Sequence, residues 1–164
     1  MTLRETFQFD LTEVDTTPNL LLLGAVRENV EDPTTGFSLT VGYGKNNSGG
    51  ALAAGDVLQW DLSEVAGTME KVSVDAASAR VAAVARHAVA SGAGAWFIIK
   101  GRAEVTSAGA ITAGAGIAPS GTAGKVEAIT GNTEDAFGFA VDAFSGAETA
   151  TCYVNCLGWV DTGA

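Results

Sequence analysis

Short turn signals containing glycine recur along the whole chain and leave room for strands but not for long helices. Pairs such as Ala108-Gly109, Ser120-Gly121 and Gly131-Asn132 separate runs that are rich in β-branched and aromatic residues. These runs cover residues 6–11, 20–26, 37–43, 57–62, 71–74, 96–100, 103–106, 126–129, 137–141 and 149–157. About ten short strands joined by Gly-rich turns predict an all-β fold, either a compact barrel or a sandwich.

The chain length favours one domain. Its 164 residues suffice for a single hydrophobic core, so we expect residues 1–164 to form one β-rich domain. The polar segment 45–50, Lys-Asn-Asn-Ser-Gly-Gly, leaves an alternative open, in which residues 1–50 form an extended N-terminal arm or subdomain. A surface loop at 45–50 is the interpretation we favour.

One predicted strand is apolar at every position, namely Trp96, Phe97, Ile98 and Ile99. Neighbouring strand residues point to opposite faces, so this run is either a central strand covered on both sides or a strand whose outer face meets another subunit. The second interpretation makes these four residues the candidate interface and predicts an oligomer.

Two further segments are informative through their spacing. In 137–141, Phe137, Phe139 and Val141 alternate with small or polar residues, which predicts a strand with one buried face. In 76–90, Val81 and Val84 belong to a pattern with helical spacing, yet 84–89 also fits the alternation of a strand, and the Gly-rich 91–94 would close a hairpin. The spacing at 76–90 therefore leaves helix and strand open.

The charge of the chain excludes one large class of partners. There are 19 acidic residues and 9 basic ones, which gives a formal net charge of −10. Such a field repels phosphate backbones, so we expect no nucleic acid partner. The first ten residues lack the features of a signal peptide, and the apolar run 20–26 is far shorter than the roughly 20 residues needed to cross a bilayer. We therefore expect no membrane segment.

Residues suited to catalysis or cofactor binding are scarce. His87 is the only histidine, so the common His-based metal sites cannot be assembled. No nucleophile elbow, phosphate-binding loop or calcium loop is present. The adjacent acids Glu31-Asp32 and Glu134-Asp135 are typical of solvated loop tips. We predict that the protein is not an enzyme and has no cofactor and no metal.

The chain has two cysteines, Cys152 and Cys156. In an extended strand this C-x-x-x-C pair would lie about 13 Å apart, well beyond disulfide reach. We expect two free thiols, which fits synthesis in a cytoplasm.

The tryptophans Trp60, Trp96 and Trp159 could stack against sugar rings, or they could pack in the core or at a subunit interface. Packing is the interpretation we favour. The sugar-binding alternative requires that tryptophans be exposed.

Several segments, in a fixed order, carry a resemblance to a known family. They are 48–57 (Ser-Gly-Gly-Ala-Leu-Ala-Ala-Gly-Asp-Val), 84–92 (Val-Ala-Arg-His-Ala-Val-Ala-Ser-Gly) running into 96–101, then 110–114, 122–126, 137–141 and a last strand at 149–157. Together they resemble the small decoration proteins of tailed-bacteriophage capsids, also called cement or head-stabilising proteins. The resemblance covers residues 20–158.

The resemblance implies a protein that binds the outer surface of an icosahedral phage capsid and stabilises it by bridging copies of the major capsid protein. It implies a homotrimer, a place on the virion after synthesis in the host cytoplasm, and no catalytic residues. It also favours a strand over a helix at 82–90. Two alternatives remain open: a tail- or fibre-associated virion structural module, and a carbohydrate-binding β-module.

Overall fold

The computed structural model describes residues 11–19, 22–60, 68–71, 81–130 and 136–156, and every regular element among them is a β-strand. The strands are β1 (Val14–Asp15), β2 (Val26–Glu31), β3 (Ser38–Asn46), β4 (Val57–Trp60), β5 (Thr68–Lys71), β6 (Val81–Val84), β7 (Gly94–Thr106), β8 (Gly116–Pro119), β9 (Val126–Ala128), β10 (Gly138–Ala140) and β11 (Thr149–Asn155). The predicted all-β fold is confirmed.

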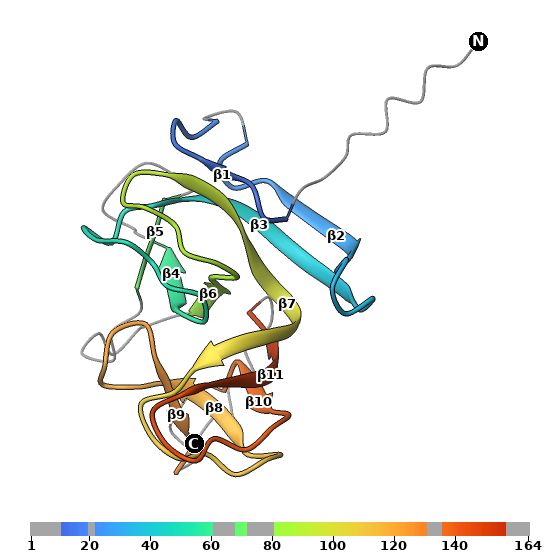
Figure 1. Ribbon diagram of the computed structural model, residues 1–164, viewed down its shortest axis with the longest axis vertical. Coiled ribbons are helices and arrows are strands. Elements are labelled where there is room, and N and C mark those ends of the chain that lie inside the picture. Colours follow the sequence, from blue (N-terminus) through green and yellow to red (C-terminus); the bar gives the residue numbers. More distant parts are fainter. Residues whose placement is uncertain (1–10, 20–21, 61–67, 72–80, 131–135, 157–164) are drawn as a thin grey trace, which may run out of the picture.

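Five of these strands close into a small barrel (Figure 1). β3 pairs with β5, β5 with β4, β4 with β6 and β6 with β7, and β7 pairs back with β3. The β3–β5 pairing is parallel, and the other four are antiparallel. Closure of the ring satisfies the strand edges that an open sheet would leave unpaired.

The interior of the barrel is narrow, and glycines on β3 provide the space. The strand register places Gly42 opposite Phe97 and Gly44 opposite Ala95. A Cβ atom at Gly42 would lie 2.7 Å from Cδ1 of Ile99, and one at Gly44 would lie 3.1 Å from the Met69 side chain. Both glycines therefore leave room for the buried residues of the barrel cluster, which are Leu52, Leu58, Met69, Ala83, Ala85, Val89, Ala93, Ala95, Phe97 and Ile99.

β7 is the longest strand, and it belongs to both parts of the molecule. Its first half closes the barrel against β3 and β6, and its second half pairs with β11. Gly101, with a φ of +123°, lies where the strand passes from one part to the other. Beyond β11 the sheet continues through β10 and β8 to β9 (Figure 1). We call the sheet formed by the end of β7 with β11, β10, β8 and β9 the lower sheet.

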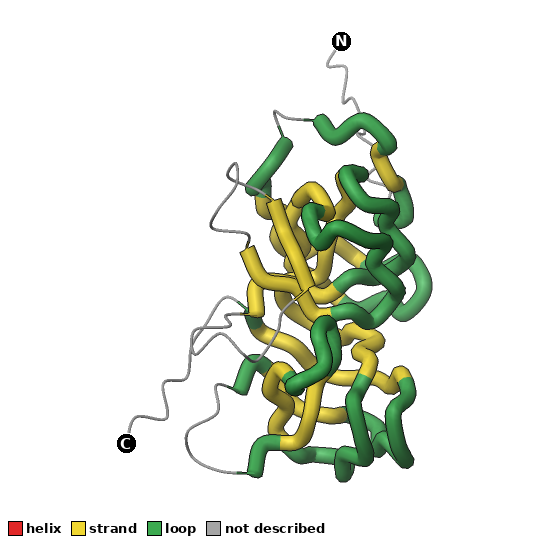
Figure 2. Tube along the Cα trace, turned by 90° about the vertical axis from the view of Figure 1, so that its left-hand side faces the viewer, coloured by secondary structure: helices red, strands yellow, loops and turns green. Residues whose placement is uncertain are grey.

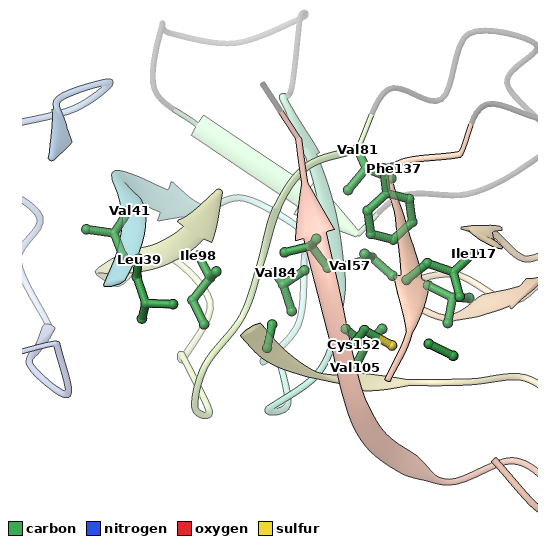
Figure 3. Close-up of a cluster of buried hydrophobic side chains, with 14 of the residues drawn as sticks. Leu39, Val41, Val57, Val81, Val84, Ile98, Val105, Ile117, Phe137 and Cys152 are labelled. Atoms are coloured by element: carbon green, nitrogen blue, oxygen red, sulfur yellow. The ribbon is translucent and has the colours of Figure 1, made fainter. Parts of the chain in front are cut away.

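The outer wall of the barrel and the inner face of the lower sheet share one buried cluster. Val57 and Val84 come from the barrel, and Val105 and Cys152 come from the lower sheet, and Figure 3 shows these side chains gathered together. In the perpendicular view of Figure 2 the strands again form an upper and a lower group. Burial of apolar side chains between the two parts stabilises their arrangement.

Residues 11–19 and 22–25 cover part of the barrel wall and are held by Tyr43. The Tyr43 hydroxyl donates a hydrogen bond to Asp15 and accepts one from the backbone N–H of Asn19 at 3.1 Å. β1 also pairs with the start of β7. Burial and the Asp15 hydrogen bond raise the pKa of Tyr43 to about 12. The hydroxyl therefore keeps its proton, and both contacts, throughout the neutral range.

The polar segment 45–50 begins inside β3. Asn46 is fully buried, and its Nδ2 donates to the carbonyl oxygens of Gly50 and Val89, each at 2.9 Å. Its Oδ1 accepts hydrogen bonds from the backbone N–H and the hydroxyl of Ser48. One buried amide thus fixes the loop at 47–50 against the connection between β6 and β7.

Most of the predicted strands are present with shifted ends. The segments 96–100 and 103–106 form one strand, β7, and the segments at 37–43, 57–60, 126–129 and 149–156 correspond to β3, β4, β9 and β11. The ambiguous segment forms β6 at Val81–Val84, as the strand interpretation predicts, but residues 85–90 are not part of that strand and contain only an isolated bridge from Val89 to Leu52. The predicted positions 6–10, 20–21, 61–62, 72–74, 76–80 and 157 lie outside the described residues.

The predicted strand at 20–26 is wrong. Residues 22–24 form a turn that is closed by a hydrogen bond from the N–H of Ala25 to the carbonyl of Leu22 at 2.8 Å, and β2 begins only at Val26. Leu22 and Leu23 still pack against the shared cluster. A run of apolar residues indicates that a segment packs against the protein core, but it does not indicate that the backbone of the segment is a β-strand.

Substitution of Gly101 tests the bend in β7. A residue with a side chain is strained at a φ of +123°, and its Cβ would lie 2.6 Å from Cδ2 of Leu39 and 3.1 Å from the carbonyl oxygen of Ser38. We expect Gly101→Ala to lower the free energy of unfolding by about 2 kcal/mol or more, measured by urea denaturation.

The matched control is Gly109→Ala, where nothing lies within 4 Å of the added Cβ. For this control we expect a change of no more than about 0.5 kcal/mol. Similar losses in both variants would show that the bend places no special demand on residue 101.

Candidate interaction surface

The four residues of the candidate interface lie inside the molecule. Trp96, Phe97, Ile98 and Ile99 are exposed by only 8%, 0%, 4% and 3%. Phe97 and Ile99 point into the barrel, and Trp96 and Ile98 belong to the shared cluster. The structure agrees with the first interpretation of this run, a central strand that is covered on both sides by the same chain. These side chains therefore offer no surface to a second subunit, because the chain's own barrel and cluster cover them.

A row of larger side chains crosses the outer face of the lower sheet instead. The register pairs Arg102 with Tyr153 and Tyr153 with Phe139, so these three share one face. The rings of Phe139 and Tyr153 stack at 5.6 Å between centroids with an interplanar angle of 18°. The Arg102 guanidinium lies 4.9 Å from the centre of the Phe37 ring. We call Phe37, Arg102, Tyr153 and Phe139 the aromatic–arginine row.

The row is open to solvent. Phe37 is 47% exposed, Phe139 is 46% exposed, and the adjoining Val141 is 36% exposed. The prediction of one buried face at 137–141 holds for β10, but the fully buried residue is Ala140 and the exposed one is Phe139. Ala140 and the Phe137 ring, which directly precedes β10, both lie in the shared cluster, whereas the Phe139 ring lies outside it. Alternation in sequence identifies two faces but not which of them meets the core.

A groove with a volume of about 320 Å³ adjoins the row and is bordered by Arg102, Glu104, Thr151, Arg86 and the turn between β2 and β3. Within it, Nη2 of Arg86 lies 2.7 Å from Oδ1 of Asp32. Oε1 of Glu104 accepts a hydrogen bond from the Thr151 hydroxyl at 3.0 Å. The groove therefore joins three segments that are distant in sequence.

Asp32 organises the turn that forms one wall of this groove. It accepts hydrogen bonds from the backbone N–H of Thr34 and the hydroxyl of Thr35, both at 2.9 Å. Burial acts to raise the pKa of Asp32, but the hydrogen bonds from Thr34, Arg86 and Thr35 outweigh it and hold that pKa below its usual value. The expectation of a solvated loop tip is thus wrong for Asp32, which is 7% exposed. The pair Glu134-Asp135 lies outside the described residues.

The two arginines at the groove retain unused donors. Among the described residues, Nη1 of Arg86 is buried and has no hydrogen-bond partner. Arg102 makes no ion pair with any residue in the described part of the chain. The one signal for Arg102 in the sequence is its alternation with Ala103 and Val105, which indicates an outward position.

The remaining residues considered from the sequence do not assemble a reactive centre. The Nε2 of His87 donates a hydrogen bond to the carbonyl oxygen of Leu11 at 3.2 Å, which holds the segment around Leu11 against the connection between β6 and β7. In the described ranges no three His, Cys, Asp or Glu side chains gather in a way that could hold a metal ion. Likewise, no helix in the described part has the length and apolarity to cross a membrane. The absence of enzymatic activity and of a cofactor stays a prediction.

The described tryptophans differ in their surroundings. Trp96 makes an edge-to-face contact with Tyr43 at 5.3 Å between ring centroids, as the core-packing interpretation predicts. Trp60, at the end of β4, is 37% exposed. Trp159 lies outside the described residues.

Comparison with known proteins identifies a shared fold. No protein-family model and no curated protein sequence matches the chain. Among solved structures, the head fiber gp8.5 N base of bacteriophage phi29 matches with a TM-score of 0.52 at 15% sequence identity, over 71% of this chain and 93% of that one. At this identity the match shows that the two chains share a fold.

Both cysteines are free thiols, as the spacing predicts. Cys152 is fully buried in the shared cluster, and Cys156 follows directly after β11. Burial raises the pKa of each thiol to about 12, with a smaller contribution at Cys152 from the acids Glu104 and Asp142. Because the thiolate is the reactive form, both sulfur atoms are inert near neutral pH.

We expect two free thiols per chain when the protein is titrated under denaturing, non-reducing conditions. In the native protein at pH 8, a pKa of about 12 leaves only about one thiol in ten thousand ionised. A disulfide-exchange reagent should therefore react far more slowly with native protein than with denatured protein. Rapid reaction of the native protein would show that the end of β11 is open to solvent.

Proposed function

We propose that this protein is a structural component of a phage virion that binds the outer surface of an icosahedral capsid and stabilises it by bridging copies of the major capsid protein. The observation that supports this most is the fold shared with the phi29 head fiber N base, which extends over 93% of that chain. The resemblance of segments 48–57 and 84–101 to capsid decoration proteins supports the same location.

The charge and surface of the chain are compatible with an external position. Its formal net charge of −10 opposes contact with a packaged genome. The exposed aromatic–arginine row provides apolar area for a protein contact, and its side chains adjoin one another, as in the contiguous apolar patches that mark interaction surfaces. The resemblance to decoration proteins supports a homotrimer as the assembly.

A second candidate function is the base of a fibre or of a tail-associated structure. It is favoured by the same match, because the neighbour is described as a head fiber N base. The two functions differ in their effect on the shell, since a cement protein strengthens the capsid whereas a base need only attach to it. The carbohydrate-binding alternative has less support, because Trp96 is buried and Trp60 alone among the described tryptophans is exposed.

Adding the purified protein to empty shells of the major capsid protein should raise the temperature at which they rupture, followed by light scattering on heating. A ligand that binds the assembled lattice better than the dissociated subunits stabilises the lattice by mass action. Before addition, the free protein should have three times the 16.6 kDa mass of one chain. An unrelated acidic protein of similar size is the control.

The outcomes separate the candidates. Binding without any change in rupture temperature would favour the fibre base over the cement protein. Absence of binding to the shells would contradict both capsid functions. A monomer that binds and stabilises the shells would contradict only the proposed trimer.

A further inference from the structure

We propose that the outer face of the lower sheet is the surface by which this protein docks on its capsid partner, and that the partner presents to Arg102 a carboxylate flanked by apolar side chains. The inference rests on the proposed function and specifies the chemistry of that contact.

Exposed apolar side chains are concentrated on this face. Five large apolar residues of the described chain are exposed, and three of them, Phe37, Phe139 and Val141, lie on or beside the row. The stacked Tyr153 ring adds to the same patch. Aromatic and arginine side chains together are the residue types that contribute most binding energy at protein interfaces. Covering this patch with apolar groups of a partner would remove it from water.

Arg102 gives the patch its charge preference. The Cζ of Arg102 lies over the Phe37 ring, 4.9 Å from its centre, and no ion pair among the described residues engages its N–H groups, which a planar acceptor such as a carboxylate can bind in pairs. Lys100 is exposed two residues earlier, and its register partner Asn155 lies on the same face of β11 as Tyr153. With Glu104 two residues later on the same face, the charged side chains of β7 here, Lys100, Arg102 and Glu104, carry a net charge of +1 on a chain whose formal net charge is −10. An acidic partner is therefore attracted here and repelled by much of the remaining surface.

The groove beside Arg102 can admit the carboxylate-bearing side chain. Its volume of about 320 Å³ exceeds that of one side chain, and Arg86 lies in its wall with a buried Nη1 that has no partner among the described residues. Of the two acids at the groove, Asp32 is paired with Arg86 and bonded to the turn at 34–35, whereas Glu104 accepts one hydrogen bond from Thr151 and keeps its charge. Neither acid forms an ion pair with Arg102 within the described residues.

A second copy of this chain in a face-to-face twofold contact is the less suitable occupant; the threefold contacts of the proposed trimer join two different patches and do not place this face against itself. In a twofold contact of the face with itself, Lys100 and Arg102 would approach their own equivalents, and like charges brought together in an interface are repulsive. A partner with a complementary acid avoids this cost.

The test is cosedimentation with empty shells of the major capsid protein, using matched variants of the full chain. We expect Arg102→Gln to weaken binding about tenfold or more, since a charge-assisted hydrogen-bonded pair is lost. Its control, Lys125→Gln, removes one positive charge elsewhere and should change binding by less than about twofold. Phe139→Thr should also weaken binding, whereas Trp60→Thr, at an exposed site on β4, should not. Unchanged thermal unfolding shows that each variant is folded.

A carbodiimide, which joins an amine to a carboxylate, provides a second readout. Lys100 should become crosslinked to an Asp or Glu of the major capsid protein, and Lys100→Gln should abolish that product. Wild-type binding by Arg102→Gln, or a Lys100 crosslink only to another copy of this chain, would overturn the inference while leaving the capsid function intact. Failure of the wild-type protein to bind shells would overturn the capsid function, and the inference with it.

Discussion

The burial of β7 on both of its faces is the interaction on which the rest of the structure depends. Phe97 and Ile99 fill a barrel so narrow that β3 carries Gly42 opposite Phe97 and against Ile99, while Trp96 and Ile98 contribute to the cluster that the barrel shares with the lower sheet. A slip of one residue would exchange these two sets of side chains. The register of β7 therefore determines at once how the barrel closes and where the lower sheet lies.

The same strand also positions the surface proposed for docking. Beyond the bend at Gly101, Ala103 and Val105 face the core, and Arg102 faces outward beside Tyr153. The β2–β3 turn, held by the Asp32–Arg86 ion pair, brings Phe37 to Arg102. Arg102 of the aromatic–arginine row thus lies on β7 between Gly101 and Ala103, which are both buried. A rigid support of this kind reduces the entropy lost when a partner binds.

The fold class could be predicted from the spacing of turns and β-type runs, because both are local properties of the sequence. The closure of the barrel could not, since it depends on the pairing of β3 with β7, whose paired residues, such as Thr40 and Lys100, lie far apart in the sequence. Predictions based on size and hydrophobicity alone were wrong in two places. The apolar segment at 22–25 is a turn and not a strand, and on β10 the Phe139 side chain is exposed while Ala140 is buried in the core. The candidate interaction surface could not be predicted either, because it depends on strand pairing. Arg102, Tyr153 and Phe139 become neighbours only through strand pairing, whereas the continuous apolar run at 96–99 is conspicuous in sequence and buried in the structure.

The central claim is that β7 joins the barrel and the lower sheet into one cooperative unit. Native-state hydrogen exchange tests it most directly, through the amides of Phe97 in the barrel half and Val105 in the lower-sheet half. If one shared core holds both halves, the two amides should exchange with opening free energies that agree within about 1 kcal/mol and equal the global free energy of unfolding. An opening free energy for Val105 that is several kcal/mol below that of Phe97 would show that the lower sheet opens independently, and would contradict the account.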